Sequence, residues 1–172
     1  AVMAVCSEKL GAMQTNLHMA GEVHGAAYLG STCVRALRLA SLNLGASPHG
    51  ESEAVDCCWG SAAAIVSSLG RGTQHSDEAV GNACSNGLSI AFSYDGLDAP
   101  RLEEKLFPGT SGALTSLERA LHKYGNGDHA DPVRASSLAR ATGVVLAAST
   151  SGAGSGSGNL DGKGAAELIP MP

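Results

Sequence analysis

The sequence predicts an α/β protein, a small (β/α)8 barrel of the TIM type that occupies residues 1–152 as a single domain. Short apolar runs alternate with segments of helical spacing, and such units recur about every 20 residues. Each apolar run is continuous, as expected of a strand buried on both faces. The number of units favours a closed barrel over an open, doubly wound sheet. The Gly/Ser-rich residues 153–172 are expected to form a tail.

The expected strands are the apolar runs themselves. In chain order they are Ala1–Val5, Gly21–Leu29, Leu42–Ala46, Ala62–Leu69, Leu88–Tyr94, Lys105–Pro108 and Gly143–Ala148. The pattern leaves room for one more strand near residues 126–129, where it is weakly marked.

Helices are expected between these runs because leucines and methionines there recur on one helical face. The two clearest stripes are Leu10, Met13 and Leu17, and Leu114, Leu117 and Leu121. Capping residues agree with this interpretation. The expected helix ends are Ser7 to Gly21 for the first helix, Asp98 with Pro100 for a middle one, and Asp131-Pro132 to Gly143 for the last.

Composition narrows the possible partners. The chain has 172 residues, a formal net charge of −5 and 44% hydrophobic residues. No apolar run approaches the roughly 20 residues that cross a bilayer, so no membrane partner is expected. Aromatic residues make up only 3% of the chain and no basic stripe is present, so a nucleic-acid partner is not expected either.

Cysteine and glycine usage give two further expectations. Five cysteines without the spacing of a disulfide scaffold predict free thiols and a cytoplasmic protein. The absence of a Cys-x-x-Cys motif argues against a structural metal. Glycine occurs 23 times, which is roughly twice its average usage. Because only six residues are aromatic, the core must be built mainly from Ala, Val and Leu.

Lys105 is the candidate nucleophile. It begins the apolar run Leu106-Phe107-Pro108, where a strand would carry it into the barrel interior. An apolar site lowers the pKa of a lysine and frees its lone pair for attack on a carbonyl. The alternative is an edge-strand lysine paired with Glu103 or Glu104.

Other candidates lie near expected strand ends. Glu22 could act as an acid/base group inside the barrel or be a surface residue. Ser47 follows a strand, on the face where barrel active sites form, or it caps the turn before Pro48. The stretch from Ser149 to Gly152 could offer backbone N–H groups to a phosphate, whereas the glycines from Gly154 onward are typical of a linker. Arg35 and Arg38 are expected on one solvated helix face.

The segment Lys105-Leu106-Phe107-Pro108, followed by Ser111-Gly112, resembles the class I aldolases that act on 2-keto-3-deoxy-6-phosphogluconate (KDPG). Further similarity, in the same order over the chain up to about Ser151, lies at Gly21-Glu22-Val23, Leu44-Gly45-Ala46-Ser47, Ala63 to Gly70, Asp131-Pro132-Val133-Arg134 and Leu146 to Thr150. The sequence departs from the family at His24 to Ala27, where the family has an arginine, and at Gly125-Asn126-Gly127, where the family has a Gly-Gly strand.

The resemblance implies a Schiff-base lyase that cleaves the phosphorylated keto acid to pyruvate and glyceraldehyde 3-phosphate. Lys105 would form the imine and Glu22 would move the proton. Ser47 would hold the carboxylate or keto oxygen, and Gly127, Ser149 and Thr150 would hold the phosphate. No cofactor is required, and a homotrimer is implied. The alternatives are a non-catalytic α/β ligand-binding or structural protein and a phosphosugar isomerase on the same barrel.

Overall fold

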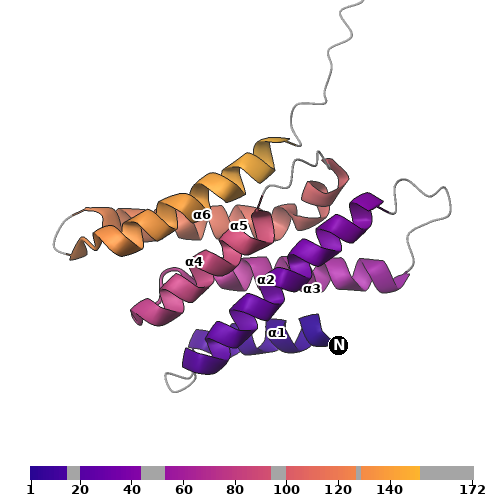
Figure 1. Ribbon diagram of the computed structural model, residues 1–172, viewed down its shortest axis with the longest axis horizontal. Coiled ribbons are helices and arrows are strands. Elements are labelled where there is room, and N and C mark those ends of the chain that lie inside the picture. Colours follow the sequence, from indigo (N-terminus) through magenta and orange to yellow (C-terminus); the bar gives the residue numbers. More distant parts are fainter. Residues whose placement is uncertain (15–19, 44–52, 94–99, 127–128, 152–172) are drawn as a thin grey trace, which may run out of the picture.

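The computed structural model describes residues 1–14, 20–43, 53–93, 100–126 and 129–151, and every regular element among them is a helix (Figure 1). The helices are α1 (Val2–Gly11), the short 3-10 helix η1 (Ala12–Gln14), α2 (Ala20–Asn43), α3 (Glu53–Gly72), α4 (Glu78–Phe92), α5 (Pro100–Gly125) and α6 (Pro132–Ser151). These residues contain no strand, so the predicted (β/α)8 barrel is wrong.

Most of the expected strands are segments of helices, and the run Ala62–Leu69 is the clearest buried example. The run Ala62–Leu69 lies in α3, where four side chains are fully buried at helical spacing: Ala62, Ile65, Val66 and Leu69. A short apolar run has the same sequence pattern in a buried strand and in a buried helix. Only the residues that flank the run show whether polar positions recur every second residue or every third to fourth residue. Here the helix continues on both sides of the run. The run Leu42–Ala46 extends beyond the described residues, as does Leu88–Tyr94 at its end.

Several of the expected helical features are confirmed. Leu114, Leu117 and Leu121 lie on α5, with Leu117 fully buried and the other two packed against the core. Asp131 caps α6, because its carboxylate accepts hydrogen bonds from the backbone N–H groups of Val133 and Arg134, at 3.1 and 3.0 Å.

The expected helix start at Pro100 is confirmed as well, because α5 begins there. The other expected helix ends are wrong where they lie among the described residues. Gly21 lies at the start of α2 and Gly143 lies inside α6, so neither ends a helix. Ser7 lies within α1 rather than at its start. Leu17 and Asp98 lie outside the described residues, as does the tail at 153–172.

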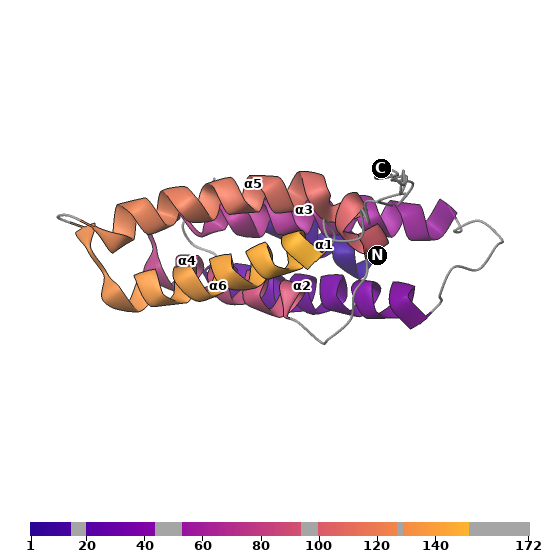
Figure 2. The ribbon, with the colours of Figure 1, turned by 90° about the horizontal axis from the view of Figure 1, so that it is seen from above.

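The six helices form two layers of three. Figures 1 and 2 show α1, α3 and α5 in one layer and α2, α4 and α6 in the other, with the odd-numbered helices running one way and the even-numbered helices the opposite way. Neighbours within each layer are in contact, and the pairs α1/α2, α3/α4 and α5/α6 connect the layers. The fold is therefore three antiparallel helix hairpins packed side by side around one core.

Glycine and alanine allow the helices of the first layer to approach closely. A Cβ atom added to Gly70 would lie 2.5 Å from the Cα atom of Ala113, and one added to Gly109 would lie 2.5 Å from the carbonyl oxygen of Ala63. The backbones of α3 and α5 are thus nearly in contact. This packing explains how a chain with many glycines and few aromatic residues fills its core.

Candidate functional site

Glu22 lies at the surface, in the first turn of α2. The ammonium group of Lys9, at the end of α1, donates a hydrogen bond to its carboxylate at 2.7 Å, and both side chains are about half exposed, at 47% for Lys9 and 50% for Glu22. The hydrogen bond and the charge of Glu22 raise the pKa of the Lys9 ammonium group above its usual value. This carboxylate is part of an exposed ion pair between α1 and α2.

Lys105 lies near the start of α5 and is half-buried. The end of α5 that carries Lys105 and the end of α2 that carries Glu22 are at opposite ends of the bundle (Figure 1). In a parallel barrel both would lie at the mouth, because the ends of the strands meet there. The helical fold removes that reason for expecting the two residues to act together.

Ser149 and Thr150 lie in the last turns of α6. The hydroxyl of Ser149 donates to the carbonyl of Val145 at 2.8 Å, and that of Thr150 donates to the carbonyls of Leu146 and Ala147, each at 3.1 Å. A helix C-terminus presents carbonyl oxygens and a partial negative charge, which disfavour a phosphate. Ser47 and Gly127 lie outside the described residues.

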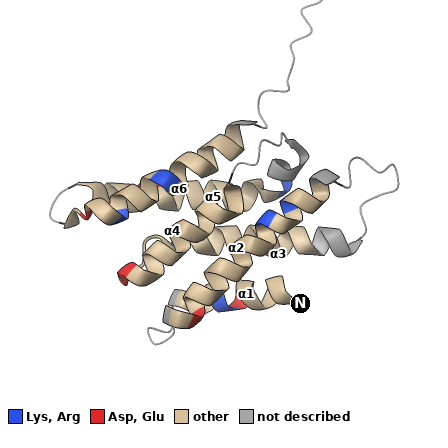
Figure 3. Ribbon diagram, in the orientation of Figure 1, with Lys and Arg blue, Asp and Glu red and all other residues tan. Residues whose placement is uncertain are grey.

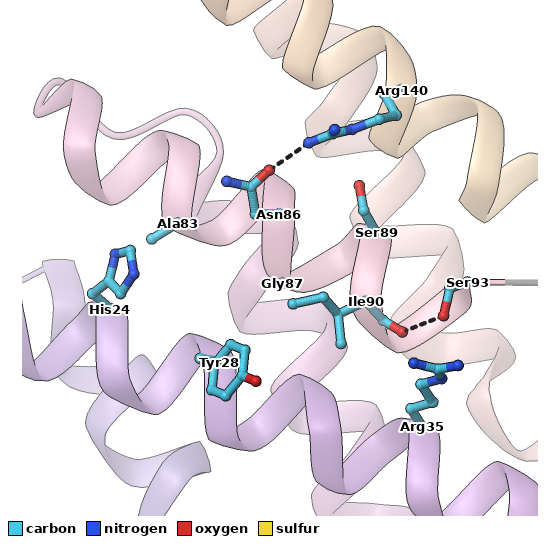
Figure 4. A pocket seen from close by; sticks show the side chains of 10 residues that line it. All are labelled: His24, Tyr28, Arg35, Ala83, Asn86, Gly87, Ser89, Ile90, Ser93 and Arg140. Carbon is cyan, nitrogen blue, oxygen red and sulfur yellow. Dashed lines mark hydrogen bonds between the residues drawn. The ribbon is translucent and has the colours of Figure 1, made fainter.

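The structure shows a different candidate site, an open groove of about 540 Å³ on the outer face of the second layer. We call it the α2/α4/α6 groove (Figure 4). It is lined by His24, Tyr28, Arg35, Ala83, Asn86, Gly87, Ser89, Ile90, Ser93 and Arg140.

The central helix of the layer forms the floor of this groove. Most of the lining residues of α4 and its C-cap are small: Ala83, Gly87 and Ser89 in the helix, and Ser93 at the cap. Gly87 also lets α4 pack close to the core, since a Cβ atom there would lie 3.1 Å from a methyl group of Leu69 and 3.4 Å from the carbonyl oxygen of Ala27. Because α4 carries small side chains and lies close to the core, the larger side chains of α2 and α6 stand above it as walls.

The α2 wall presents one face of a helix. His24, Tyr28 and Arg35 follow one another along α2 (Figure 4) at a spacing that places them on the same side. Tyr28 is 60% exposed, which is unusual for a large aromatic side chain. This wall therefore combines an aromatic ring with two nitrogen-bearing side chains.

Arg140 forms the opposite wall. Its guanidinium group donates a hydrogen bond to the side-chain oxygen of Asn86 at 2.6 Å, which holds it over α4 (Figure 4). An arginine has five N–H donors, so this contact occupies only part of its capacity. Arg140 is therefore oriented by the floor of the groove while keeping donors for a ligand.

The electrostatic character of the groove is positive. None of the described residues that line it is acidic, although the chain has 16 Asp and Glu residues. The described acidic residues of α2 and α4 are Glu22 and Glu78, and both stand in the first turns of those helices (Figure 3). Guanidinium groups stand on both walls, Arg140 beside Asn86 and Arg35 nearer to Ser93 (Figure 4), in a protein whose net charge is negative.

The sequence offered little to identify this groove. Arg35 and Arg38 were expected on one solvated face, but only Arg35 lines the groove. Arg38 instead donates to the carbonyl of Ala91 at 2.7 Å and lies over the ring of Phe92. Arg140 lies on α6, far from Arg35 in the chain. The one feature of the sequence that could have indicated a groove is the cluster of small residues along α4.

The fold and the groove define the class of this protein: its described residues form a two-layer domain of six α-helices with an open, positively charged groove. Comparison with protein-family models, curated proteins and solved structures found no match for the chain. Among the described residues, no helix has the length and apolar character needed to cross a membrane.

Proposed function

We propose that the protein is a non-catalytic binding domain whose α2/α4/α6 groove takes a small organic anion. The observation that carries this proposal is the placement of Arg35 and Arg140 on opposite walls, without an acidic residue among the described lining residues. Guanidinium groups form strong charge-assisted hydrogen bonds with carboxylates. Two of them on facing walls favour an anion between them.

The remaining lining residues favour a ligand that joins a carboxylate to an apolar group. Tyr28 and Ile90 offer an aromatic and an aliphatic surface. Ligand sites commonly combine a mostly apolar lining with a few polar groups that orient the ligand. An aromatic carboxylate could place its ring against Tyr28 and its charge toward the arginines.

Benzoate is the probe for this proposal. We expect benzoate to bind in the millimolar range, because small ligands gain limited free energy. We expect its neutral analogue benzamide to bind roughly tenfold more weakly, because it cannot form charge-assisted hydrogen bonds. Chemical shifts of the backbone amides of Asn86, Gly87 and Ile90, followed during titration, measure both affinities.

The double substitution Arg35→Gln/Arg140→Gln should weaken benzoate binding by about tenfold or more. A control is Lys123→Gln, which removes one exposed positive charge from α5, outside the groove. Equal affinity for benzoate and benzamide, or equal benzoate affinity in the double variant and the control, would contradict the proposal.

The aldolase activity implied by the family resemblance is the alternative to this proposal. The same holds for its phosphorylated keto-acid substrate and for the homotrimer. We expect borohydride in the presence of pyruvate to leave the mass of the protein unchanged, because Lys105 lies half-buried on helix α5 and not at the mouth of a barrel. Intact-mass spectrometry is the measurement. A reduced pyruvyl adduct that maps to Lys105, and is lost in Lys105→Ala, would restore the aldolase proposal.

A cytoplasmic location remains part of the proposal. Its support is the state of the described cysteines, which are free thiols at Cys6, Cys33, Cys58 and Cys84. Free thiols are typical of a reducing compartment.

A further inference from the structure

A second hollow, of about 400 Å³, lies where α3 ends. We call it the α3-end hollow. Its lining residues are Met13, Arg71, Gly72, Gln74, His75, Ser116 and Arg119. It shares none of these residues with the α2/α4/α6 groove, so it is an independent place for a ligand.

Two arginines give the α3-end hollow its charge. Arg71 comes from the last turn of α3 and Arg119 from α5, and both are exposed. The hydroxyl of Ser68 accepts a hydrogen bond from Arg71 at 3.0 Å, which restrains the guanidinium group beside its own helix. None of the described lining residues is acidic. An anion in this hollow would therefore meet two guanidinium groups from different helices.

The carbonyl oxygens at the C-terminal end of α3 already accept hydrogen bonds, so they do not face such an anion unpaired. The backbone N–H of Thr73 donates to the carbonyls of Leu69 and Gly70, each at 3.2 Å. The N–H groups of Gln74 and His75 donate to the next two carbonyls, at 3.2 and 3.0 Å. Because these oxygens are occupied by the chain that follows, the negative end of the helix dipole is partly compensated.

His75 is oriented as a hydrogen-bond donor. Its Nδ1 atom accepts a hydrogen bond from the backbone N–H of Asp77 at 3.0 Å. A neutral imidazole that accepts at Nδ1 carries its proton on Nε2. The ring lines the hollow with its Nδ1 side engaged by the backbone, so its Nε2–H is the donor available to a ligand.

The turn between α3 and α4, which carries Gln74 and His75, is held in place by a buried arginine. Arg134 of α6 is only 2% exposed, and its guanidinium group donates to the carbonyls of Thr73, at 3.1 Å, and of His75. The same group stacks on the ring of Tyr124, 3.7 Å from its centre, and the hydroxyl of Tyr124 donates to the carbonyl of His75 at 3.4 Å. Preorganised donors lose little conformational freedom when a ligand binds.

The apolar side of the hollow is also fixed. The thioether of Met13 accepts a hydrogen bond from the thiol of Cys84 at 3.6 Å. Burial raises the pKa of Cys84 to about 12, so the thiol remains a protonated donor at neutral pH. Met13 and the backbone at Gly72 provide an apolar wall next to the arginines.

From these contacts we infer that the α3-end hollow binds a phosphate monoester. The ester's phosphoryl oxygens meet the two guanidinium groups, the Nε2–H of His75, the amide of Gln74 and the hydroxyl of Ser116. A phosphate monoester carries up to two negative charges and three strong acceptor oxygens, which suits this set of donors. Its organic group lies against Met13 and Gly72.

The test is titration of the full chain with phenyl phosphate, followed by calorimetry and by the amide shifts of Gly72, Gln74 and His75. We expect the double substitution Arg71→Gln/Arg119→Gln to weaken binding by about tenfold or more, because both charge-assisted contacts are removed. Both side chains are exposed, so the variant should fold, and its circular dichroism checks this. The side-chain nitrogen spectrum should show the Nε2–H of His75 shifting when phenyl phosphate binds.

The matched control is Arg35→Gln/Arg140→Gln, which removes the same number of arginines from the α2/α4/α6 groove. It should leave the affinity for phenyl phosphate unchanged while it weakens benzoate binding. Unchanged affinity in Arg71→Gln/Arg119→Gln, or a loss confined to the groove variant, would overturn the inference. Because the two sites have separate probes and separate variants, failure of the groove proposal is distinguishable from failure of this one.

Discussion

Replacing Gly109 with alanine is expected to destabilise the protein, although the same change in most helix interiors is stabilising by about 1 kcal/mol. The added methyl group would lie 2.5 Å from the carbonyl oxygen of Ala63, inside van der Waals contact with the backbone of α3. Backbone cannot move aside as a flexible side chain can, so α3 and α5 must separate. We expect the free energy of unfolding to fall by roughly 2–3 kcal/mol, measured by chemical denaturation.

Gly112 of the same helix provides the control. A Cβ atom there would have the hydroxyl of Ser67 as its neighbour at 3.8 Å, an ordinary contact. Gly112→Ala should therefore raise the free energy of unfolding by about 0.5–1 kcal/mol, as usual for alanine in a helix. If both variants changed stability in the same direction and by the same amount, the close approach of α3 and α5 would be wrong.

Replacing Arg134 with methionine is the second change with a large expected effect. The substitution keeps an apolar stem but removes the donors to the carbonyls of Thr73 and His75 and the stacking on Tyr124. A buried carbonyl left without a partner costs about 1–3 kcal/mol. The carbonyl of Thr73 loses its donor from Arg134, while that of His75 keeps the hydrogen bond from the hydroxyl of Tyr124 at 3.4 Å. We expect the free energy of unfolding to fall by roughly 3 kcal/mol. Denaturation measures this loss.

Arg140→Met on the same helix is the matched control, because Arg140 is exposed. Its effect should remain within about 0.5 kcal/mol, as for most surface substitutions. Hydrogen exchange adds a local measurement, since the amides of Gln74 and His75 should exchange faster in Arg134→Met than in Arg140→Met. Equal stability of the two variants would show that Arg134 does not anchor the turn between α3 and α4.

Local signals in the sequence predicted only a few elements. The leucine stripe at Leu114, Leu117 and Leu121 indicates one helical face, and α5 has that face toward the core. Asp131 with Pro132 indicates a helix start because a carboxylate and a residue without N–H suit the first turn. Both signals act within one turn of chain, so the rest of the fold does not alter them.

The strands were predicted wrongly because a short, continuous apolar run does not show the spacing of polar residues that distinguishes a strand from a helix. Ala62–Leu69 is apolar on nearly every position, as a strand buried on both faces would be. In the structure α3 is a central helix of the first layer, with α1 and α5 beside it and the second layer against it. A helix surrounded on several sides loses the polar face that would reveal its spacing. Glycines that were interpreted as helix ends instead lie within helices.

The resemblance to an aldolase also depended on short segments of sequence. The segment Lys105 to Pro108 lies in a helix rather than at the end of a strand. The proposed binding sites, in contrast, join residues from separate helices, such as Arg35 with Arg140 and Arg71 with Arg119. Their mutual placement depends on how the hairpins pack.

The sequence by itself determined the composition of this protein, with abundant small residues, few aromatic ones and a net negative charge. It also determined the cap that begins α6. Only the tertiary structure decided that these segments are helices in two layers, that glycines let α3 and α5 touch, and that arginines gather around two hollows. The physical reason is the distance along the chain over which each interaction acts. Caps and stripes act over a few neighbouring residues, whereas packing and electrostatic complementarity act between segments that are distant in the chain.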